Sequence, residues 1–311
     1  MDQGSNVGGG KTSHNTEISS VQAWLLASRP KTLTAAVAPV MVGSAVAIAY
    51  DEFHLGIGLL ALFVAIMIQV GTNFYNDVVD FEQGTDTGDR LGPMRVTQMG
   101  LLTPRQVKTG VVVTFTAAAV AGLILAWVGG WPVVIIGLAC ILAGLAYSSG
   151  PFPLTRLGLG DLFAMVFFGF VGVAGTVYVQ MGEVPGLAWW AALGVGATIT
   201  ALLIVNNIRD IDSDRRAGRR TLPVVWGKNA GLIEYVAMLV IAYTVPLVVI
   251  LKGWVNAWAL IPLLSVPLAV FLVRWIAITE GEPLNRALAG TGQLVLLYGF
   301  LFSAGIVLGI S

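Results

Sequence analysis

The stretch TGVVVTFTAAAVAGLILAWVGGWPVVIIGLACILAGLAYSSGPFPLT, residues 109–155, contains no charged side chain. A helix needs about 20 mostly apolar residues to cross the hydrocarbon core of a bilayer, so this stretch is too long for a single crossing. Its middle, Gly129-Gly130-Trp131-Pro132, combines two glycines with a proline, and such clusters interrupt helices. The stretch therefore predicts two consecutive membrane-spanning helices joined by a tight turn.

The same apolar character extends over the whole chain of 311 residues. Hydrophobic residues make up 56% and charged residues only 11%, and the mean hydropathy is +0.83, whereas soluble domains are about 25% charged. Solid apolar blocks, without alternation of apolar and polar residues, favour helices over a closed β-barrel. The predicted fold is therefore all-α, a polytopic membrane protein of nine transmembrane helices. The predicted spans are residues 32–50, 55–76, 109–128, 131–149, 162–182, 187–208, 230–251, 254–273 and 287–310.

Basic residues divide unequally between the two sides of the membrane that these spans define. Of the 17 Lys and Arg residues, only Lys252 falls in a loop on the side opposite the N-terminus. Cytoplasmic loops of helical membrane proteins carry the excess of Lys and Arg. The N-terminus is therefore predicted to be cytoplasmic and the C-terminus to lie outside, in a multi-pass protein of the plasma membrane surrounded by lipid.

Composition also limits the domain plan and the chemistry. Residues 1–20 are rich in Gly, Ser and Asn and are predicted to be a disordered cytoplasmic tail, with residues 21–311 as a single transmembrane domain. Basic and acidic residues number 17 each, which gives no bulk attraction to nucleic acid. A single cysteine, Cys140, excludes an intramolecular disulfide, and only two histidines, His14 and His54, argue against a zinc site or a His-based triad. Catalysis would depend on carboxylates, basic residues, Asn, Tyr or Ser.

Two predicted cytoplasmic loops are much longer than the others, and they are residues 77–108 and 209–229. Each begins at the pattern Asn-x-x-x-Asp, formed by Asn76 and Asp80 in the first case and by Asn206 and Asp210 in the second. Residues four apart share one face of a helix, so the two side chains of each pair can point at a common atom. The repeated pattern indicates a weak internal duplication.

Further acidic residues continue both patterns. Eight of the 17 acidic residues fall in these two windows: Asp77, Asp80, Glu82, Asp86, Asp89, Asp210, Asp212 and Asp214. Oxygen ligands without His or Cys favour Mg²⁺ over zinc. With Mg²⁺ between them such carboxylates bind diphosphate, and nearby arginines complete the charge balance; these are Arg95, Arg215, Arg219 and Arg220. The pattern predicts diphosphate chemistry at the membrane face, and the alternative is a set of solvated loop charges.

The two motifs also resemble those of a known family. GTNFYNDVVDFEQGTD (residues 71–86) and NNIRDIDSDRRAGRRTLPVVWG (residues 206–227) are similar to the Asp-rich motifs of the UbiA superfamily of intramembrane aromatic prenyltransferases. The resemblance is strongest to its 1,4-dihydroxy-2-naphthoate polyprenyltransferase branch, in the menaquinone pathway. Supporting segments are SRPKTLTAAVAPVMVGSA (28–45), DRLGPMRVTQMGLLTP (89–104), YSSGPFPLTRLGLGD (147–161) and FFGFVGVAGTVYVQ (167–180).

The resemblance implies a role for individual residues. The metal ligands it implies are Asn76, Asp80, Asp86, Asn206, Asp210 and Asp214. The diphosphate-binding residues are Arg95, Arg215, Arg219 and Arg220, and the catalytic residues are Asp80, Asp210, Arg95 and Tyr147. Weaker acceptor-binding candidates are Arg29, Lys31 and Arg156, for which anchoring at the cytoplasmic face is the alternative. Gly84 stands where the hydroxybenzoate branch usually carries an acid, which argues against a hydroxybenzoate acceptor.

The activity that the resemblance implies agrees with the residue chemistry. Mg²⁺ held by both motifs would bridge a polyprenyl diphosphate, stabilise its leaving group and allow an allylic carbocation to form. Reaction with 1,4-dihydroxy-2-naphthoate and loss of CO₂ would give demethylmenaquinol. The cation needs protection from water, and a central cavity accessible to lipid and cytosol would provide it while accepting the prenyl chain.

Three other functions are alternatives at this point. A secondary transporter also has many spans and repeated motifs, although transport predicts charges near mid-bilayer and here the acids gather at one face. A CDP-alcohol phosphatidyltransferase also uses Mg²⁺ on lipids, but the sequence lacks the D-G-x-x-A-R segment of that class. Within the UbiA superfamily, homogentisate, hydroxybenzoate or a glycerol-phosphate lipid is an alternative acceptor.

Overall fold

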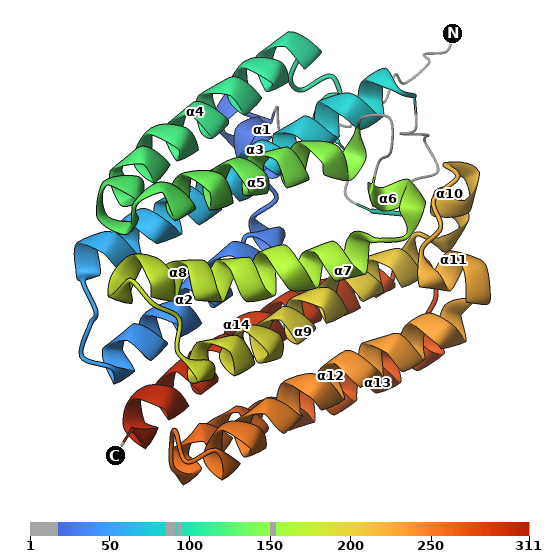
Figure 1. The fold of residues 1–311 in the computed structure, drawn as a ribbon. Coiled ribbons are helices and arrows are strands. Elements are labelled where there is room, and N and C mark those ends of the chain that lie inside the picture. Colours follow the sequence, from blue (N-terminus) through green and yellow to red (C-terminus); the bar gives the residue numbers. More distant parts are fainter. Residues whose placement is uncertain (1–17, 85–90, 93–94, 150–153, 311) are drawn as a thin grey trace, which may run out of the picture.

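The computed structural model describes residues 18–84, 91–92, 95–149 and 154–310. Over these residues all regular secondary structure is helical, which confirms the predicted all-α class, and Figure 1 shows the long helices stacked in layers. The first elements are α1 (Ser20–Ser28), η1 (Pro30–Thr32), α2 (Thr34–Ala49), α3 (Leu55–Glu82), α4 (Pro104–Gly129), α5 (Trp131–Ser148), α6 (Leu154–Leu157), α7 (Gly160–Ala164), η2 (Met165–Val171) and α8 (Gly172–Met181). The remaining elements are α9 (Gly186–Arg209), α10 (Ile211–Arg216), α11 (Leu222–Trp226), α12 (Lys228–Leu251), η3 (Ala257–Ser265), α13 (Val266–Ile278) and α14 (Leu284–Gly309).

Within the described residues, seven helical segments are long and apolar enough to cross a membrane. They are Leu55–Glu82, Pro104–Gly129, Gly160–Met181, Gly186–Arg209, Lys228–Leu251, Ala257–Ile278 and Leu284–Gly309. The segment Ser20–Thr32 and α2 are bent by 55° at their junction, and they raise the number to eight if they form one span. Helix α5 is apolar but shorter. The predicted number of nine spans therefore stays a prediction.

The turn predicted in the middle of residues 109–155 is present. Helix α4 ends at Gly129, helix α5 begins at Trp131, and Figure 1 shows the two helices side by side. Gly130 joins them with a φ of 72°, in a region of backbone conformation that favours glycine. Pro132 lies in the first turn of α5, where the missing N–H costs no hydrogen bond within the helix. The quoted stretch thus forms two helices, as its breaker cluster predicts.

Helix α9 lies at the centre of the bundle. Figure 1 shows it between α7–α8 on one side and α12–α13 on the other, with α14 beside it. Its small residues permit a very close approach, since a Cβ atom added at Gly169 of η2 would lie 2.7 Å from the Cα atom of Gly196 on α9. The second acidic motif begins at the end of α9, so the most buried helix of the bundle holds that motif in place.

The two acidic motifs meet at one end of the bundle, near α6, α10 and α11 in Figure 1. Helix α3 extends beyond the predicted span, so Asn76 and Asp80 lie on one continuous helix. The second motif lies at a helix end, because α9 ends at Arg209 and α10 begins at Ile211. The break at Asp210 lets its carboxylate meet the guanidinium of Arg209, a contact that adjacent residues of a regular helix do not make.

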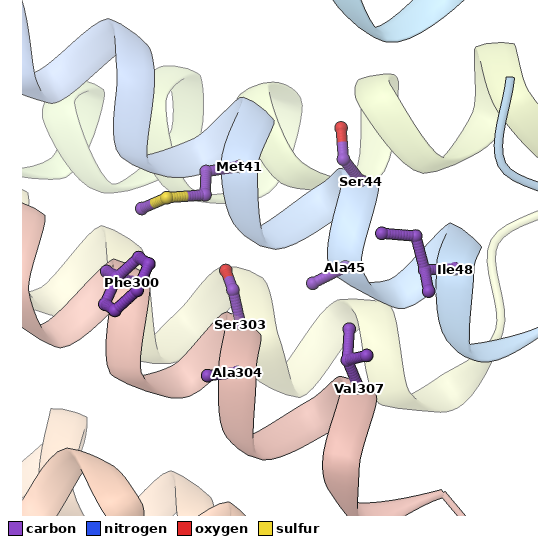
Figure 2. A pocket seen from close by; sticks show the side chains of 8 residues that line it. All are labelled: Met41, Ser44, Ala45, Ile48, Phe300, Ser303, Ala304 and Val307. Atoms are coloured by element: carbon purple, nitrogen blue, oxygen red, sulfur yellow. The ribbon is translucent and has the colours of Figure 1, made fainter. Parts of the chain in front are cut away.

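An apolar groove lies between α2 and α14, and Figure 2 shows side chains of both helices along it. Its volume is about 350 Å³, and its lining includes Met41, Phe300 and Ser303. Ser303 lies about 28 Å along α14 from the first residue of that helix, at a rise of 1.5 Å per residue. The groove is therefore remote from the acidic motifs. The central cavity implied by the family resemblance is a different feature and stays a prediction.

Candidate active site

The first acidic motif occupies the last turns of α3. Asp80 is 4% exposed and forms an ion pair with Arg95, whose side chain is equally buried. Asp77 is also buried, and it accepts hydrogen bonds from the backbone N–H groups of Val96 at 3.2 Å and Thr97 at 3.3 Å and from the Thr97 hydroxyl. Asp77 therefore anchors the segment that follows Arg95, and this anchor brings the Arg95 guanidinium to the motif. The sequence pattern placed Asp77 beside the motif without a role.

Arg209 holds the second acidic motif together. Its Nε donates a hydrogen bond to Asp210 Oδ1 at 2.8 Å, and its Nη2 donates to Asp210 Oδ2 at 2.6 Å and to Asn206 Oδ1 at 2.7 Å. Its side chain is buried, so these charge-assisted hydrogen bonds replace water around the guanidinium. Sequence reasoning gave Arg209 no role. The signal was present, as a basic residue inside the N-N-x-R-D run of an otherwise apolar helix end.

Arg219 connects the two motifs. Its Nη1 lies 3.0 Å from Asp214 Oδ1, and its Nη2 lies 3.9 Å from Asp80 Oδ1. One guanidinium thus faces a carboxylate from α3 and another from α10. The fold therefore brings together the two motifs that the sequence pattern pairs, and it places Arg219 between them.

The charges of this pair influence each other. Burial raises the pKa of the Asp214 carboxyl to about 6, and the Arg219 guanidinium partly offsets that rise. Burial acts in the opposite direction on Arg219, but the carboxylates of Asp214 and Asp80 outweigh it and raise the Arg219 pKa above its usual value. A carboxylate that is poorly solvated in this way is stabilised in its charged form by any further cation placed beside it.

Oxygen donors for a divalent cation are present, but the described residues do not form a preassembled metal site. Among them, no group of three or more His, Cys, Asp or Glu side chains has the geometry to hold a metal ion. The predicted ligands Asp80, Asp210 and Asp214 each face a guanidinium. Asp86, a further predicted ligand, lies outside the described residues. The donor types, buried carboxylates preceded by an Asn one helical turn earlier, are those that suit Mg²⁺.

Tyr147 lies in the last turn of α5. A Cβ atom added at Gly160 would lie 3.6 Å from its hydroxyl, so the hydroxyl faces the start of α7. The neighbouring Asp161 accepts a hydrogen bond from Asn207 Nδ2 at 3.1 Å. Asn207 is the second Asn of the N-N-x-R-D run, and its contact with Asp161 fastens the end of α9 to α7 near Tyr147.

Three of the predicted arginines occupy exposed positions. Arg215 is exposed, and its Nη1 lies 3.4 Å from Asp212 Oδ1, which is exposed as well. Arg156 and Arg220 are also exposed. Exposed ion pairs such as the one at Arg215 contribute about 0–1 kcal/mol to stability, so the structure gives these side chains no strong structural role. Their parts in diphosphate or acceptor binding stay predictions.

Arg29 and Lys31 lie at the bend between α1 and α2. Asn73 of α3 fixes this bend, because its Nδ2 donates hydrogen bonds to the Ser28 carbonyl at 2.9 Å and to the Thr32 hydroxyl at 3.1 Å. Arg29 itself adopts a φ of 52°, which turns the chain sharply. Asn73 precedes the first motif by about one helical turn, so the bend is held close to that motif. Sequence reasoning missed Asn73, whose signal was an amide inside an apolar span.

Comparison with known proteins bears directly on this arrangement. A sequence model of the UbiA prenyltransferase family matches residues 36–308. The chain belongs to the UbiA prenyltransferase family. The resemblance predicted from the two motifs is thereby confirmed. Membership of the UbiA family also favours prenyl transfer over the transporter and phosphatidyltransferase alternatives.

Individual UbiA relatives cover nearly the whole chain. The 1,4-dihydroxy-2-naphthoate octaprenyltransferase of Escherichia coli (strain K12) is 35% identical over 302 residues, which span 94% of this chain and 97% of that protein. The apo structure of a UbiA homologue from Aeropyrum pernix K1 has a TM-score of 0.67 at 18% identity and covers 89% of this chain and 97% of its own. A UbiA homologue from Archaeoglobus fulgidus bound to GPP and Mg²⁺ has a TM-score of 0.62 at 17% identity and covers 90% and 99%. The two structures show that the fold is shared.

Proposed function

We propose that the protein transfers a polyprenyl group from a polyprenyl diphosphate to 1,4-dihydroxy-2-naphthoate, with loss of CO₂, to give demethylmenaquinol. The observation that carries the proposal is the meeting of two Asp motifs around Arg219, in a chain 35% identical to a 1,4-dihydroxy-2-naphthoate octaprenyltransferase. We place the reaction at the cytoplasmic face of the plasma membrane, because the predicted topology puts both motifs there. A site at that face is accessible to both the lipid and the soluble aromatic substrate.

Mg²⁺ is the proposed cofactor. The residues that would hold it are Asn76, Asp80, Asn206, Asp210 and Asp214, with Asp86 as a further proposed ligand. When bound, Mg²⁺ supplies positive charge that stabilises the leaving diphosphate. The A. fulgidus homologue bound to GPP and Mg²⁺ supports this assignment.

We propose that two arginines bind and orient the diphosphate. Arg95 and Arg219 both lie against Asp80, so their guanidinium groups stand beside the carboxylates at which the phosphates would be held. A planar guanidinium binds phosphate oxygens through two parallel hydrogen bonds. Substrate binding would exchange carboxylate partners of these arginines for phosphate partners and make Asp80 available as a metal ligand. Arg209 would keep its contacts and orient the second motif.

Bond cleavage in the proposed reaction is dissociative. The allylic C–O bond of the prenyl diphosphate breaks, and the diphosphate leaves with the electron pair. The electron-rich ring carbon that bears the carboxylate then attacks the cation and forms the new C–C bond. The bond from that carbon to the carboxylate breaks, its electron pair returns to the ring, and CO₂ leaves. Helices that exclude water prevent capture of the cation by water. Tyr147, whose hydroxyl faces the start of α7, is the proposed side chain beside the reacting groups.

An assay with the purified full chain tests the proposal. The protein receives Mg²⁺, a long-chain polyprenyl diphosphate and either 1,4-dihydroxy-2-naphthoate or 4-hydroxybenzoate, and mass spectrometry identifies the products. We expect a decarboxylated prenyl naphthalenediol from the first acceptor alone, and none after chelation with EDTA. Product from 4-hydroxybenzoate alone would support prenyl transfer but contradict 1,4-dihydroxy-2-naphthoate as the acceptor. Full activity in EDTA would overturn the metal requirement.

A further inference from the structure

Asn285 contacts both cytoplasmic loops from a third element. It lies in the first turn of α14, far in sequence from either motif. Its Oδ1 accepts a hydrogen bond from Arg209 Nη1 at 2.9 Å, and its Nδ2 donates one to the backbone carbonyl of Leu91 at 2.8 Å. Leu91 belongs to the loop that follows the first motif, and Arg209 belongs to the second motif. The side chain of Asn285 therefore joins the loop after the first motif to the second motif.

The contact with Arg209 completes the surroundings of a buried charge. The Nε and Nη2 groups of this guanidinium are directed at Asp210 and Asn206, and Asn285 takes the remaining Nη1 direction. The guanidinium is a planar fork, so a partner on its third side limits rotation of the whole group. The orientation of Arg209 in turn decides where the oxygens of Asn206 and Asp210 lie.

The contact with Leu91 reaches towards the other motif. Leu91 precedes Arg95 by four residues, and Arg95 forms the buried ion pair with Asp80. Gly281, in the turn before α14, lies near the same loop, since a Cβ atom added there would lie 4.0 Å from Leu91 Cδ1. The start of α14 thus contacts the first loop through the hydrogen bond of Asn285, with Gly281 close by.

We infer that Asn285 is a positioning residue for the proposed prenyl transfer, on which this inference rests. It sets the second motif relative to the loop that carries Arg95, and it acts through Arg209 and Leu91 without touching substrate. An amide suits the position because it offers an acceptor and a donor at the same time. A carboxylate keeps the acceptor and loses the donor, and alanine loses both. Removal of a group that orients metal ligands typically lowers metal affinity or activity about 10–100-fold.

The first test does not depend on activity. Hydrogen–deuterium exchange of the full-length, metal-free protein is compared between wild type, Asn285→Ala and Asn256→Ala. Asn256 is the matched control, because its side-chain Oδ1 caps η3 by accepting from the Trp258 N–H at 3.0 Å, while its backbone N–H donates to the Gly309 carbonyl at the far end of α14. We expect faster exchange over residues 95–102 and 206–216 in Asn285→Ala and unchanged exchange there in the control. Unchanged exchange in either segment of Asn285→Ala overturns the inference.

The second test separates positioning from general destabilisation. We expect Asn285→Ala to raise the Mg²⁺ concentration for half-maximal activity and the KM for prenyl diphosphate about tenfold, with less change in kcat and in the acceptor KM. Asn285→Asp keeps the acceptor for Arg209 and loses the donor to Leu91, so we expect a smaller rise above wild type. Three outcomes overturn the inference. Asn285→Ala could lower kcat alone, Asn285→Asp could keep the wild-type Mg²⁺ requirement and KM, or Asn256→Ala could change these constants as much as Asn285→Ala does. An inactive wild type whose variants show the expected exchange pattern overturns the proposed function and supports the positioning role.

Discussion

Three arginine–aspartate pairs form the centre of the candidate active site, and they are Asp80–Arg95, Asp210–Arg209 and Asp214–Arg219. Removing one partner of a buried pair leaves a charge without compensation, which typically costs about 3–5 kcal/mol. The destabilisation from such a deletion would be mistaken for a loss of catalysis. Substitutions that keep the size and polarity of the side chain are therefore the informative ones at this site.

Asp80→Asn and Asp210→Asn are such substitutions, and we expect each to abolish turnover while the protein stays folded. The amide keeps the shape of the carboxylate but loses the negative charge that the proposed metal needs. We expect the initial rate of prenyl transfer by folded, purified protein to fall at least about 100-fold. The unfolding temperature falls as well, because the amide keeps a hydrogen-bond acceptor but leaves the buried Arg95 or Arg209 without a negative partner. Asp212→Asn is the control, because Asp212 is exposed in the same segment. Near-normal rates in both site variants would contradict the assignment.

At the level of elements, the site depends on helices that cross closely and then end or break at the end of the bundle where the two motifs meet. Helix α3 carries the first motif without interruption, whereas the junction of α9 and α10 breaks at Asp210. Helix α9 is held in place by the tight contact between Gly169 and Gly196. Small residues at such crossings let two backbones approach closely. Precision at the site therefore depends on packing well away from it.

Gly169→Ala tests this packing. An added Cβ would lie 2.7 Å from the Gly196 Cα and 2.9 Å from the Ala192 carbonyl oxygen, and backbone atoms do not rotate away. Overpacking of this kind costs about 1–3 kcal/mol, so we expect a lower unfolding temperature in detergent. Gly175→Ala is the matched control in the same span, because its added Cβ has nothing within 4 Å. Equal stability of the two variants would show that the crossing is not close.

The molecule as a whole has an asymmetric distribution of charge. Both motifs lie at one end of the bundle, and Lys252 is the one basic residue that the predicted spans place on the opposite side of the membrane. Cytoplasmic loops of such proteins carry the excess of Lys and Arg. The end with the motifs is therefore expected to face the cytoplasm, where the proposed metal and aromatic acceptor are available.

Thiol labelling in intact cells tests this orientation. Cys140 is the single native cysteine, so Lys252→Cys and Asp212→Cys are each introduced into a Cys140→Ser background. Both positions are exposed. We expect a membrane-impermeant maleimide to label Lys252→Cys in intact cells and Asp212→Cys only after permeabilisation. The reverse pattern would place the candidate active site outside the cell and contradict the proposed topology.

Features that depend on neighbouring residues were predictable from the sequence. The run over residues 109–155 predicted two helices because bilayer thickness sets the length of an apolar span, and Gly129–Pro132 located the turn between them. The pairs at Asn76 and Asn206 were visible because residues four apart share a helix face. The second pair does meet at a common atom, because Asn206 Oδ1 and Asp210 Oδ2 both accept hydrogen bonds from Arg209 Nη2. Helical periodicity did not reveal that this atom belongs to Arg209, or that α9 ends there.

The sequence by itself therefore determined the all-α membrane class, the two Asp motifs and the family. Only the tertiary structure decided how the motifs meet: through Arg219 between Asp214 and Asp80, and through Asn285 between Arg209 and Leu91. Helix periodicity and span length depend on residues that are close together in the chain, so the sequence reveals them directly. A hydrogen bond between residues far apart in the chain has no characteristic sequence spacing, because it depends on how whole helices cross.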